Sequence, residues 1–309
     1  MSEPWDCIVI GGGAAGLSAA LVLGRARRRT LVVDAGGQSN RPAPGIGGLL
    51  GHDGQPPDEF YALGRRQLAA YPSVLHREAC VVAASNGPDG LTVTTSDGAI
   101  ERAHRLILAT GMEYRLPAVA GAAERWGRSV FHCPFCHGWE VQGRALAVLD
   151  RDPETAVHRA LLLTAWSDTV TLLTNGPAPF GDDERQRLAA AAVEVDERPV
   201  AAVCGPPDDL TAIAFADGSE RPCGGLLVGA VLHQRGDLAA QLGLALAPPT
   251  PIAADAVACG PMGETNVPGV VVAGDAGAGM PSVANAIAAG SNAAAAVVRS
   301  LVTTHSPHG

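Results

Sequence analysis

The chain has 309 residues, enough for about two domains, and its 47% hydrophobic content can fill a large core. Its net charge of −9 argues against a nucleic-acid partner or a membrane-surface partner. All 22 basic residues are arginines, which excludes Schiff-base chemistry by a lysine.

The N-terminus MSEPWDCIVI lacks the basic segment and apolar run of a signal peptide. We also find no apolar stretch of the ~20 residues needed to span a bilayer. We therefore expect a cytoplasmic protein with no membrane partner. In that compartment a Cys-x-x-Cys pair is more often catalytic than structural.

The first predicted element is a buried strand in DCIVIGGGAAG, residues 6–16, which runs into Gly11-x-Gly13-x-x-Gly16 and a helix. Such glycines allow a tight turn and let a pyrophosphate approach the backbone at the helix N-terminus. A second strand, RTLVVDAG, delivers Asp34 where a carboxylate should meet the ribose hydroxyls of an adenosine. Together these elements predict a dinucleotide site.

A further strand, RLILATGMEYR at residues 105–115, closes on Ala109-Thr110-Gly111. It is followed by HCPFCHGWE, in which Cys133 and Cys136 stand two residues apart. A zinc site would need two more ligands, and no second Cys-x-x-Cys or His-x-x-x-His exists. A purely structural disulfide is the other alternative, but the pattern favours a redox pair. The other five cysteines are expected to be small buried hydrophobes.

Residues 139–176 again indicate strand, turn, helix and strand, which is the shape of a second dinucleotide-binding unit. Where such a turn needs glycines, the chain has Asp150, Arg151, Asp152 and Pro153. Two carboxylates there would repel a pyrophosphate, at a cost on the order of several kcal/mol. Downstream, TNVPGVVVAGDAG ends a strand in Gly274-Asp275, and residues 283–300 form a helix rich in small residues.

The three motifs around Gly13, Ala109 and Asp275 resemble the two-domain flavoprotein disulfide reductases, and their order matches the low-molecular-weight thioredoxin reductases. The resemblance covers essentially the whole chain and implies FAD as cofactor. The residues expected at FAD are Gly11, Gly13, Ala14, Ala15, Gly16, Asp34, Ala35, Gln38, Arg41, His52, Asp53, Val81, Ala109, Thr110, Gly111, Gly274, Asp275, Ser282 and Val283. Arg41, His52 and Asp53 lie in a Gly- and Pro-rich loop, residues 36–60, and are expected near the flavin ring or a substrate pocket.

The resemblance also implies that Cys136 lies against the flavin and Cys133 exchanges with substrate, although the sequence alone does not assign these roles. His137 stands where thioredoxin reductases have an acid/base aspartate. An imidazole can take a proton from a thiol near neutral pH and return it. His132 has two open interpretations, a proton-relay group or a structural histidine.

The motif Cys-x-x-Cys-His-Gly, the altered second turn and an Ala-Trp-Ser-Asp helix end resemble the FAD-dependent dithiol oxidases. These enzymes close disulfides in natural products such as gliotoxin, holomycin and romidepsin. The resemblance implies a small-molecule dithiol substrate such as a dithiolopyrrolone, a role in antibiotic biosynthesis, reoxidation by dioxygen with release of hydrogen peroxide, and a homodimer. Two alternatives remain: a thioredoxin reductase using ferredoxin, a second flavoprotein or a degenerate NAD(P)H site, and a non-catalytic redox sensor.

The predicted fold class is α/β, with two Rossmann-like dinucleotide-binding domains of the thioredoxin reductase kind. The FAD domain is expected at residues 1–116 plus 246–309. The second domain, residues 117–245, is inserted in the first, carries the Cys-x-x-Cys pair and lacks a working nicotinamide motif.

Overall fold

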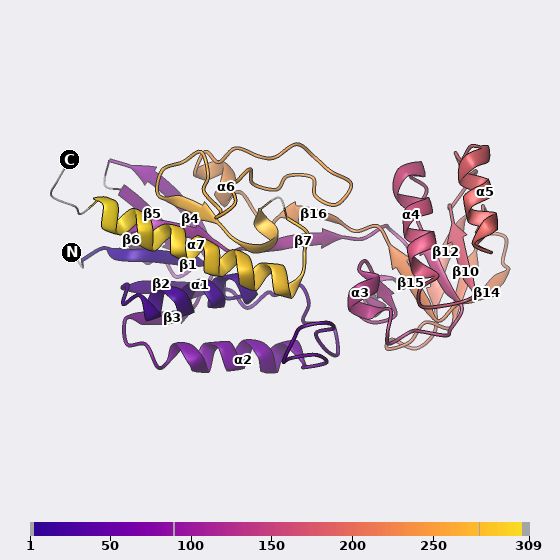
Figure 1. The fold of residues 1–309 in the computed structure, drawn as a ribbon, viewed down its shortest axis with the longest axis horizontal. Helices are drawn as coiled ribbons and strands as arrows, with labels where there is room; N and C mark the ends of the chain where they lie inside the picture. Colours follow the sequence, from indigo (N-terminus) through magenta and orange to yellow (C-terminus); the bar gives the residue numbers. More distant parts are fainter. Residues whose placement is uncertain (1–2, 89, 278, 305–309) are drawn as a thin grey trace. The chain divides into compact units, whose positions relative to one another are not determined.

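The computed structural model describes residues 3–88, 90–277 and 279–304, and the chain divides into two compact units (Figure 1). Unit 1 comprises Met1–Ser39, Pro57–Tyr114 and Leu232–Gly309, and unit 2 comprises Asn40–Pro56 and Arg115–Val231. The units differ from the predicted domains in two places. The loop Asn40–Pro56 groups with unit 2, because it packs against the redox segment, and the chain returns to unit 1 at residue 232 rather than 246.

Unit 1 is built on a seven-stranded sheet in the order β3-β2-β1-β6-β5-β4, with β17 also paired to β6. The pairs that join β3, β2, β1, β6 and β17 are parallel, whereas β4, β5 and β6 pair antiparallel. β2 is buried along its whole length, as expected for a parallel strand covered on both faces. The strands are β1 (Trp5–Ile10), β2 (Thr30–Asp34), β3 (Val74–Glu78), β4 (Val81–Gly87), β5 (Gly90–Thr95), β6 (Ile100–Leu108) and β17 (Val270–Val272).

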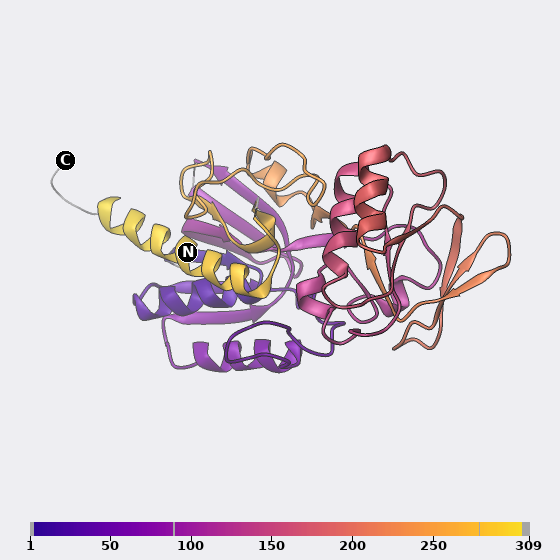
Figure 2. The same cartoon turned by 45° about the vertical axis from the view of Figure 1, so that its right-hand side comes forward.

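The helices of unit 1 are α1 (Ala14–Arg25), α2 (Pro57–Leu68), α6 (Leu238–Gln241) and α7 (Val283–Thr304), with a 3-10 turn η2 (Gly274–Ala276). Figures 1 and 2 show α7 running beside α1. A Cβ atom at Gly290 would lie 2.0 Å from the carbonyl oxygen of Ala15, so the two helices approach closely only because residue 290 is glycine.

The helix α7 corrects one expectation, because its length and composition are sufficient to cross a membrane. In the structure about a third of this helix is buried, and the buried face packs against the core of unit 1. Ala293, Val297 and Leu301 join the buried cluster that includes α1, and the Ser18 hydroxyl donates to the carbonyl of Ile287 at 2.7 Å. A core helix that packs in this way passes the same length test as a membrane span.

Unit 2 contains an all-parallel sheet in the order β11-β10-β9-β15-β8 and a separate antiparallel sheet in the order β12-β13-β14 (Figure 2). The first sheet consists of β8 (Val130–Phe131), β9 (Leu146–Leu149), β10 (Val170–Leu173), β11 (Glu194–Asp196) and β15 (Gly225–Val228). The second consists of β12 (Val200–Cys204), β13 (Ala212–Phe215) and β14 (Glu220–Pro222). The helices are η1 (Ala123–Arg125), α3 (Pro134–His137), α4 (Pro153–Leu163) and α5 (Asp182–Ala190).

Two strands lie where the chain passes between the units. β7 (Met112–Arg115) and β16 (Val231–Gln234) pair with each other in a two-stranded sheet. The α/β class and the Rossmann-like sheets predicted from the sequence are confirmed. The prediction that all five other cysteines are buried is wrong. Cys7 and Cys223 are buried and Cys204 is half-buried, whereas Cys80 and Cys259 are exposed because they stand in connecting segments outside the strands.

Candidate functional site

The glycine turn of unit 1 connects β1 to α1 and leaves no room for side chains. Gly11 has φ +107°, and a Cβ atom there would lie 2.2 Å from the carbonyl oxygen of Ala109. A Cβ atom at Gly16 would lie 1.8 Å from the carbonyl oxygen of Gly11. Gly13 is the N-cap residue of α1 and makes no side-chain cap. The first N–H groups of α1 are therefore not occupied by a capping side chain, as a pyrophosphate requires.

Asp34, at the end of β2, lies directly against this turn. A Cβ atom at Gly12 would lie 2.6 Å from the Asp34 carboxylate, which is almost fully buried. The carboxylate accepts from the backbone N–H of Gly36 at 3.1 Å and from the Gln38 amide at 3.2 Å. The structure thus brings Asp34 and Gln38 to the glycine turn, as predicted for the ribose end of an adenosine.

Asp275 lies in η2, and Gly274 before it has φ +72°. Burial raises the pKa of Asp275, while a hydrogen bond from the Tyr114 hydroxyl at 2.9 Å acts in the opposite direction. A carboxylate accepts hydrogen bonds at both oxygens, so Asp275 retains the capacity to bind a ligand hydroxyl. A Cβ atom at Gly274 would lie 2.9 Å from the Ala15 side chain, which places this segment beside the start of α1.

The remaining residues predicted at the cofactor fall into two groups. In unit 1, the segment that follows β6 lies beside Gly11 and consists of Ala109, Thr110 and Gly111. Three predicted residues begin elements: Ala14 begins α1, Val81 begins β4 and Val283 begins α7. Ala35 follows β2 and is exposed. Ser282 accepts the backbone N–H of Asn285 at 3.1 Å and so caps α7. Arg41, His52 and Asp53 instead belong to unit 2, where Asp53 accepts from the Gly48 N–H at 2.7 Å. Their predicted contact with the flavin stays a prediction.

The redox pair of unit 2 is present as a disulfide between Cys133 and Cys136, with the two Cα atoms 5.3 Å apart. Cys133 is the N-cap residue of the one-turn helix α3, which begins at Pro134. The loop Asn40–Pro56 packs on this turn, since a Cβ atom at Gly47 would lie 2.6 Å from the carbonyl oxygen of Cys136. The two sulfurs are bonded to each other, as expected of the oxidised form of a redox pair.

His137 follows the pair and has one defined tautomer. Its Nε2 lies 3.1 Å from the carbonyl oxygen of Gly127, which only accepts hydrogen bonds, so Nε2 carries the proton. Its Nδ1 is buried and makes no hydrogen bond to the residues that the structure describes. Burial lowers the pKa of His137, and Glu140 partly opposes this effect. The backbone carbonyls of Cys133 and Gly127 also oppose the effect of burial, but the net shift is downward, so the ring is neutral near pH 7.

His132 precedes the pair and stacks on Trp126, with ring centroids 5.4 Å apart. Burial, followed by the nearby His137, lowers the pKa of His132 to about 4. A histidine with this pKa is neutral under ordinary conditions. Both interpretations of His132, a relay group and a structural group, remain open.

The helix α4 follows the turn at which the sequence predicts a second dinucleotide-binding unit, and its N-terminus is capped by its own residues. The Asp152 carboxylate accepts from the backbone N–H groups of Glu154 at 3.0 Å and Thr155 at 3.2 Å. Asp150, only slightly exposed, forms an ion pair with Arg159 and accepts from the Thr155 hydroxyl at 2.7 Å. The expected repulsion of a pyrophosphate by Asp150 is reduced by Arg159. The Asp152 cap is the stronger obstacle, because it already uses the N–H donors that a phosphate needs.

The residues after β10 are likewise engaged in local contacts. The Thr174 hydroxyl donates to the carbonyl of Gly176 at 2.6 Å, and the Asn175 amide oxygen accepts from the N–H of Val200 at 2.8 Å. No basic side chain follows β10 directly in the sequence Thr174-Asn175-Gly176.

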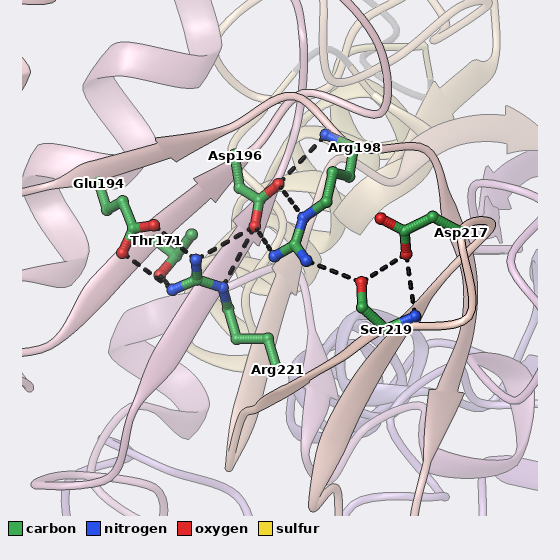
Figure 3. Close-up of polar contacts among 7 residues, drawn as sticks. All are labelled: Thr171, Glu194, Asp196, Arg198, Asp217, Ser219 and Arg221. Atoms are coloured by element: carbon green, nitrogen blue, oxygen red, sulfur yellow. Dashed lines mark hydrogen bonds and ion pairs between the residues drawn. The ribbon is translucent and has the colours of Figure 1, made fainter.

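Figure 3 shows a charged cluster between the neighbouring strand β11 and β14. Its Asp196, on β11, pairs in register with Leu173. Asp196 accepts from Arg198 at 2.5 Å and from Arg221 at 3.2 Å, and Arg221 also binds Glu194 (Figure 3). The cluster lines an open cavity of about 580 Å³ together with Arg185 and Glu197. Its three arginines face three carboxylates, so this cavity carries no net positive charge with which to attract a phosphate.

Comparisons with known proteins agree with this geometry. Residues 5–290 match the family model described as pyridine nucleotide-disulphide oxidoreductase. The chain belongs to this family. The flavoprotein is 33% identical to thioredoxin reductase sirT of Leptosphaeria maculans over 95% of its own length and 93% of that protein. It is 34% identical to thioredoxin reductase tcpT of Claviceps purpurea over 92% and 90% of the two chains. A crystal structure of an oxidoreductase from Agrobacterium tumefaciens is 38% identical, with a TM-score of 0.91, and covers 97% of this chain and 99% of that one.

The cofactor of the flavoprotein is FAD, as in the thioredoxin reductases to which it is related. The residues of unit 1 fit this group. The side-chain-free turn at Gly11 and Gly13 suits a pyrophosphate, the buried Asp34 suits a ribose diol, and the half-buried Asp275 suits a hydroxyl of the ribityl chain.

Two residues of the site were missed by sequence reasoning. Tyr114 binds Asp275 from 161 positions away, and burial raises its pKa. Trp166 packs on α3, since a Cβ atom at Gly138 would lie 2.8 Å from its ring. In the sequence, the signal for Trp166 was its place in the Ala-Trp-Ser-Asp motif. The signal for Tyr114 was an aromatic residue three positions after Gly111.

Proposed function

We propose that this flavoprotein oxidises a small-molecule dithiol to its intramolecular disulfide, with dioxygen as the electron acceptor and hydrogen peroxide as the second product. The observation that carries the proposal is the contrast between two helix N-termini. At α1 the capping position is Gly13, with no side chain on the N–H donors, whereas at α4 the Asp152 carboxylate occupies them. Electrons from NADPH would need the second site.

The chemistry on the protein side is a thiol–disulfide exchange. A substrate thiolate attacks the disulfide at Cys133, and the second substrate thiol, held nearby, resolves the mixed disulfide at high effective concentration. The substrate loses two electrons and two protons and becomes a cyclic disulfide, while Cys133 and Cys136 gain them and become a dithiol. The chemistry that FAD supplies when bound is two-electron transfer, by which the dithiol returns to a disulfide and dioxygen is reduced to hydrogen peroxide.

His137 is the proposed base in this exchange. Its Nε2–H is held by the Gly127 carbonyl, which leaves Nδ1 to accept a proton from a thiol. Because burial keeps the ring neutral near pH 7, this base is in its active form without prior deprotonation. In this proposal the protein is a cytoplasmic homodimer that acts in antibiotic biosynthesis. Its substrate is a dithiolopyrrolone such as the reduced form of holomycin.

A second candidate function is a thioredoxin reductase that uses ferredoxin or a degenerate NAD(P)H site. It is favoured by the names of the relatives, which are thioredoxin reductases. Under this alternative, electrons run from the flavin to the Cys133–Cys136 pair and on to a protein disulfide.

The test is oxygen uptake by the FAD-loaded protein with dithiothreitol, reduced holomycin or reduced thioredoxin, beside anaerobic flavin spectra with NADPH and NADH. We expect one dioxygen consumed and one peroxide formed per small dithiol oxidised, and no bleaching by either nicotinamide. As matched controls, Cys133→Ser should abolish uptake, and Cys80→Ser, at an exposed free cysteine of unit 1, should not. Rapid bleaching by NADPH, or turnover only with thioredoxin, would establish the second candidate instead.

A further inference from the structure

Two exposed aromatic side chains stand in the segment that carries the disulfide of unit 2, and a third aromatic side chain, Trp166, contacts one of them. Phe135, between the two cysteines, is 72% exposed, and Trp139, three residues beyond Cys136, is 73% exposed. Trp166, at the end of the segment after α4, is half-buried. Large exposed aromatic side chains are uncommon, and where they gather they mark a surface that binds a ligand or a partner.

Phe135 is exposed but held in one orientation. Its ring meets the ring of Trp166 edge-on, with centroids 5.5 Å apart and planes at 81°. Trp166 is itself fixed, because its ring fills the space beside Gly138 and its carbonyl accepts the N–H of Gly143 at 2.9 Å. A ring that is already ordered loses little conformational entropy when a ligand stacks on it.

We propose that Phe135 and Trp139 bind the apolar body of the dithiol substrate, and that Trp166 positions Phe135. This inference rests on the proposed function, since it names the class of dithiol that the site takes. The disulfide determines the occupant, because a molecule bound beside it reacts only if it carries a thiol. The segment from Cys133 to Glu140 contains no arginine and one carboxylate, that of Glu140, which would repel an anionic ligand. The surface therefore favours an uncharged, flat, ring-bearing dithiol over an anionic one.

The inference predicts a selective loss of affinity. Truncating either ring should raise the KM of a ring-bearing dithiol about 5- to 20-fold, the range of a lost aromatic contact plus its buried area. The kcat should stay within about twofold, because neither ring supplies a proton or a sulfur. For dithiothreitol, which has no ring to stack, both constants should stay within about twofold.

The experiment compares ortho-xylene dithiol with dithiothreitol in the oxygen-uptake assay. The variants are Phe135→Ala, Trp139→Ala, Trp166→Ala and the conservative Trp166→Phe, with Ile100→Ala as a control at an exposed apolar side chain of unit 1. We expect Trp166→Ala to raise the KM of ortho-xylene dithiol as Phe135→Ala does. Trp166→Phe should recover most of that loss, which a merely structural defect would not do.

Binding is measured separately, by calorimetry with the cyclic disulfide of ortho-xylene dithiol, which needs no turnover. Weaker binding to Phe135→Ala and Trp139→Ala than to the parent protein supports the inference even where oxygen uptake is absent and the proposed function fails. Equal binding by all variants overturns it, as do equal KM changes for both dithiols. A KM change for reduced thioredoxin alone also overturns it, since the occupant of the surface would then be a protein.

Discussion

The hydrogen bond between His137 Nε2 and the Gly127 carbonyl has a measurable consequence for the pH dependence of the reaction. Replacing the base in His137→Ala should lower kcat/KM for a small dithiol by roughly 10²- to 10⁴-fold, the usual contribution of a positioned acid/base group. The control is His158→Ala, which removes an exposed histidine on α4.

The pH profile of the parent enzyme gives the second readout. Burial holds the pKa of His137 below its ordinary value of 6.5, and the neutral ring is the form that the proposed mechanism requires. The rate should therefore persist as the pH falls to 6.5 and decline only at lower pH, and this acidic decline should vanish in His137→Ala. A decline that begins above pH 6.5, or one that survives the substitution, would assign the proton transfer to another group.

At the scale of single residues, the sequence predicted functional residues that lie close together in the chain. It did not predict contacts between residues that are far apart in the chain. Cys133, Cys136 and His137 were identified because the motif lies within five consecutive residues of the sequence. The contact of Tyr114 with Asp275 joins residues 161 positions apart. Such a contact depends on how β7 and η2 come together in the fold, for which the spacing of residues gives no signal.

At the scale of elements, α1 and α4 are related βαβ helices whose N-termini differ in what satisfies their N–H groups. Asp152→Ala removes the cap of α4 and should lower the free energy of unfolding by about 0.5–2 kcal/mol. Asp152→Asn is the matched control, because asparagine caps a helix about as well as aspartate and should cost only a few tenths of a kcal/mol. Urea denaturation followed by circular dichroism measures both variants. If the alanine variant unfolds at the same urea concentration as the asparagine variant, the contacts of Asp152 do not stabilise α4.

The predicted elements were those that carry a motif or a continuous apolar run. The buried strands β1, β2, β9 and β10 and the helices α1, α4 and α7 all follow from such patterns. The antiparallel sheet β12-β13-β14 carries no chemical motif and was not assigned. The loop Asn40–Pro56 groups with unit 2 rather than with the predicted FAD domain. This grouping goes with a backbone contact between Gly47 and Cys136 that the composition of a Gly- and Pro-rich segment does not reveal.

At the scale of the whole molecule, the two tasks lie in separate units. The residues that fit FAD line unit 1, whereas the redox pair lies in unit 2, and each unit has buried clusters of its own. Cys133→Ser and Cys136→Ser should therefore each retain about one FAD per chain while losing turnover with every dithiol.

This prediction is checked by the flavin absorbance of purified protein beside oxygen uptake, with Cys259→Ser as a control at an exposed free cysteine of unit 1. Loss of FAD from either variant would show that the redox pair also supports the cofactor. Residual turnover in both would remove the disulfide from the reaction.

The chain passes between the two units four times, after Ser39, Pro56, Tyr114 and Val231. The later two passages are strands that pair with each other, whereas the earlier two enclose the loop whose Gly47 touches Cys136. Insertions, deletions or grafts in this loop should therefore affect the disulfide first, although both ends of the loop join segments of unit 1. For anyone redesigning the enzyme, changes in the loop Asn40–Pro56 alter the backbone that touches Cys136, and they should spare Arg41, His52 and Asp53, whose contact with the flavin is predicted.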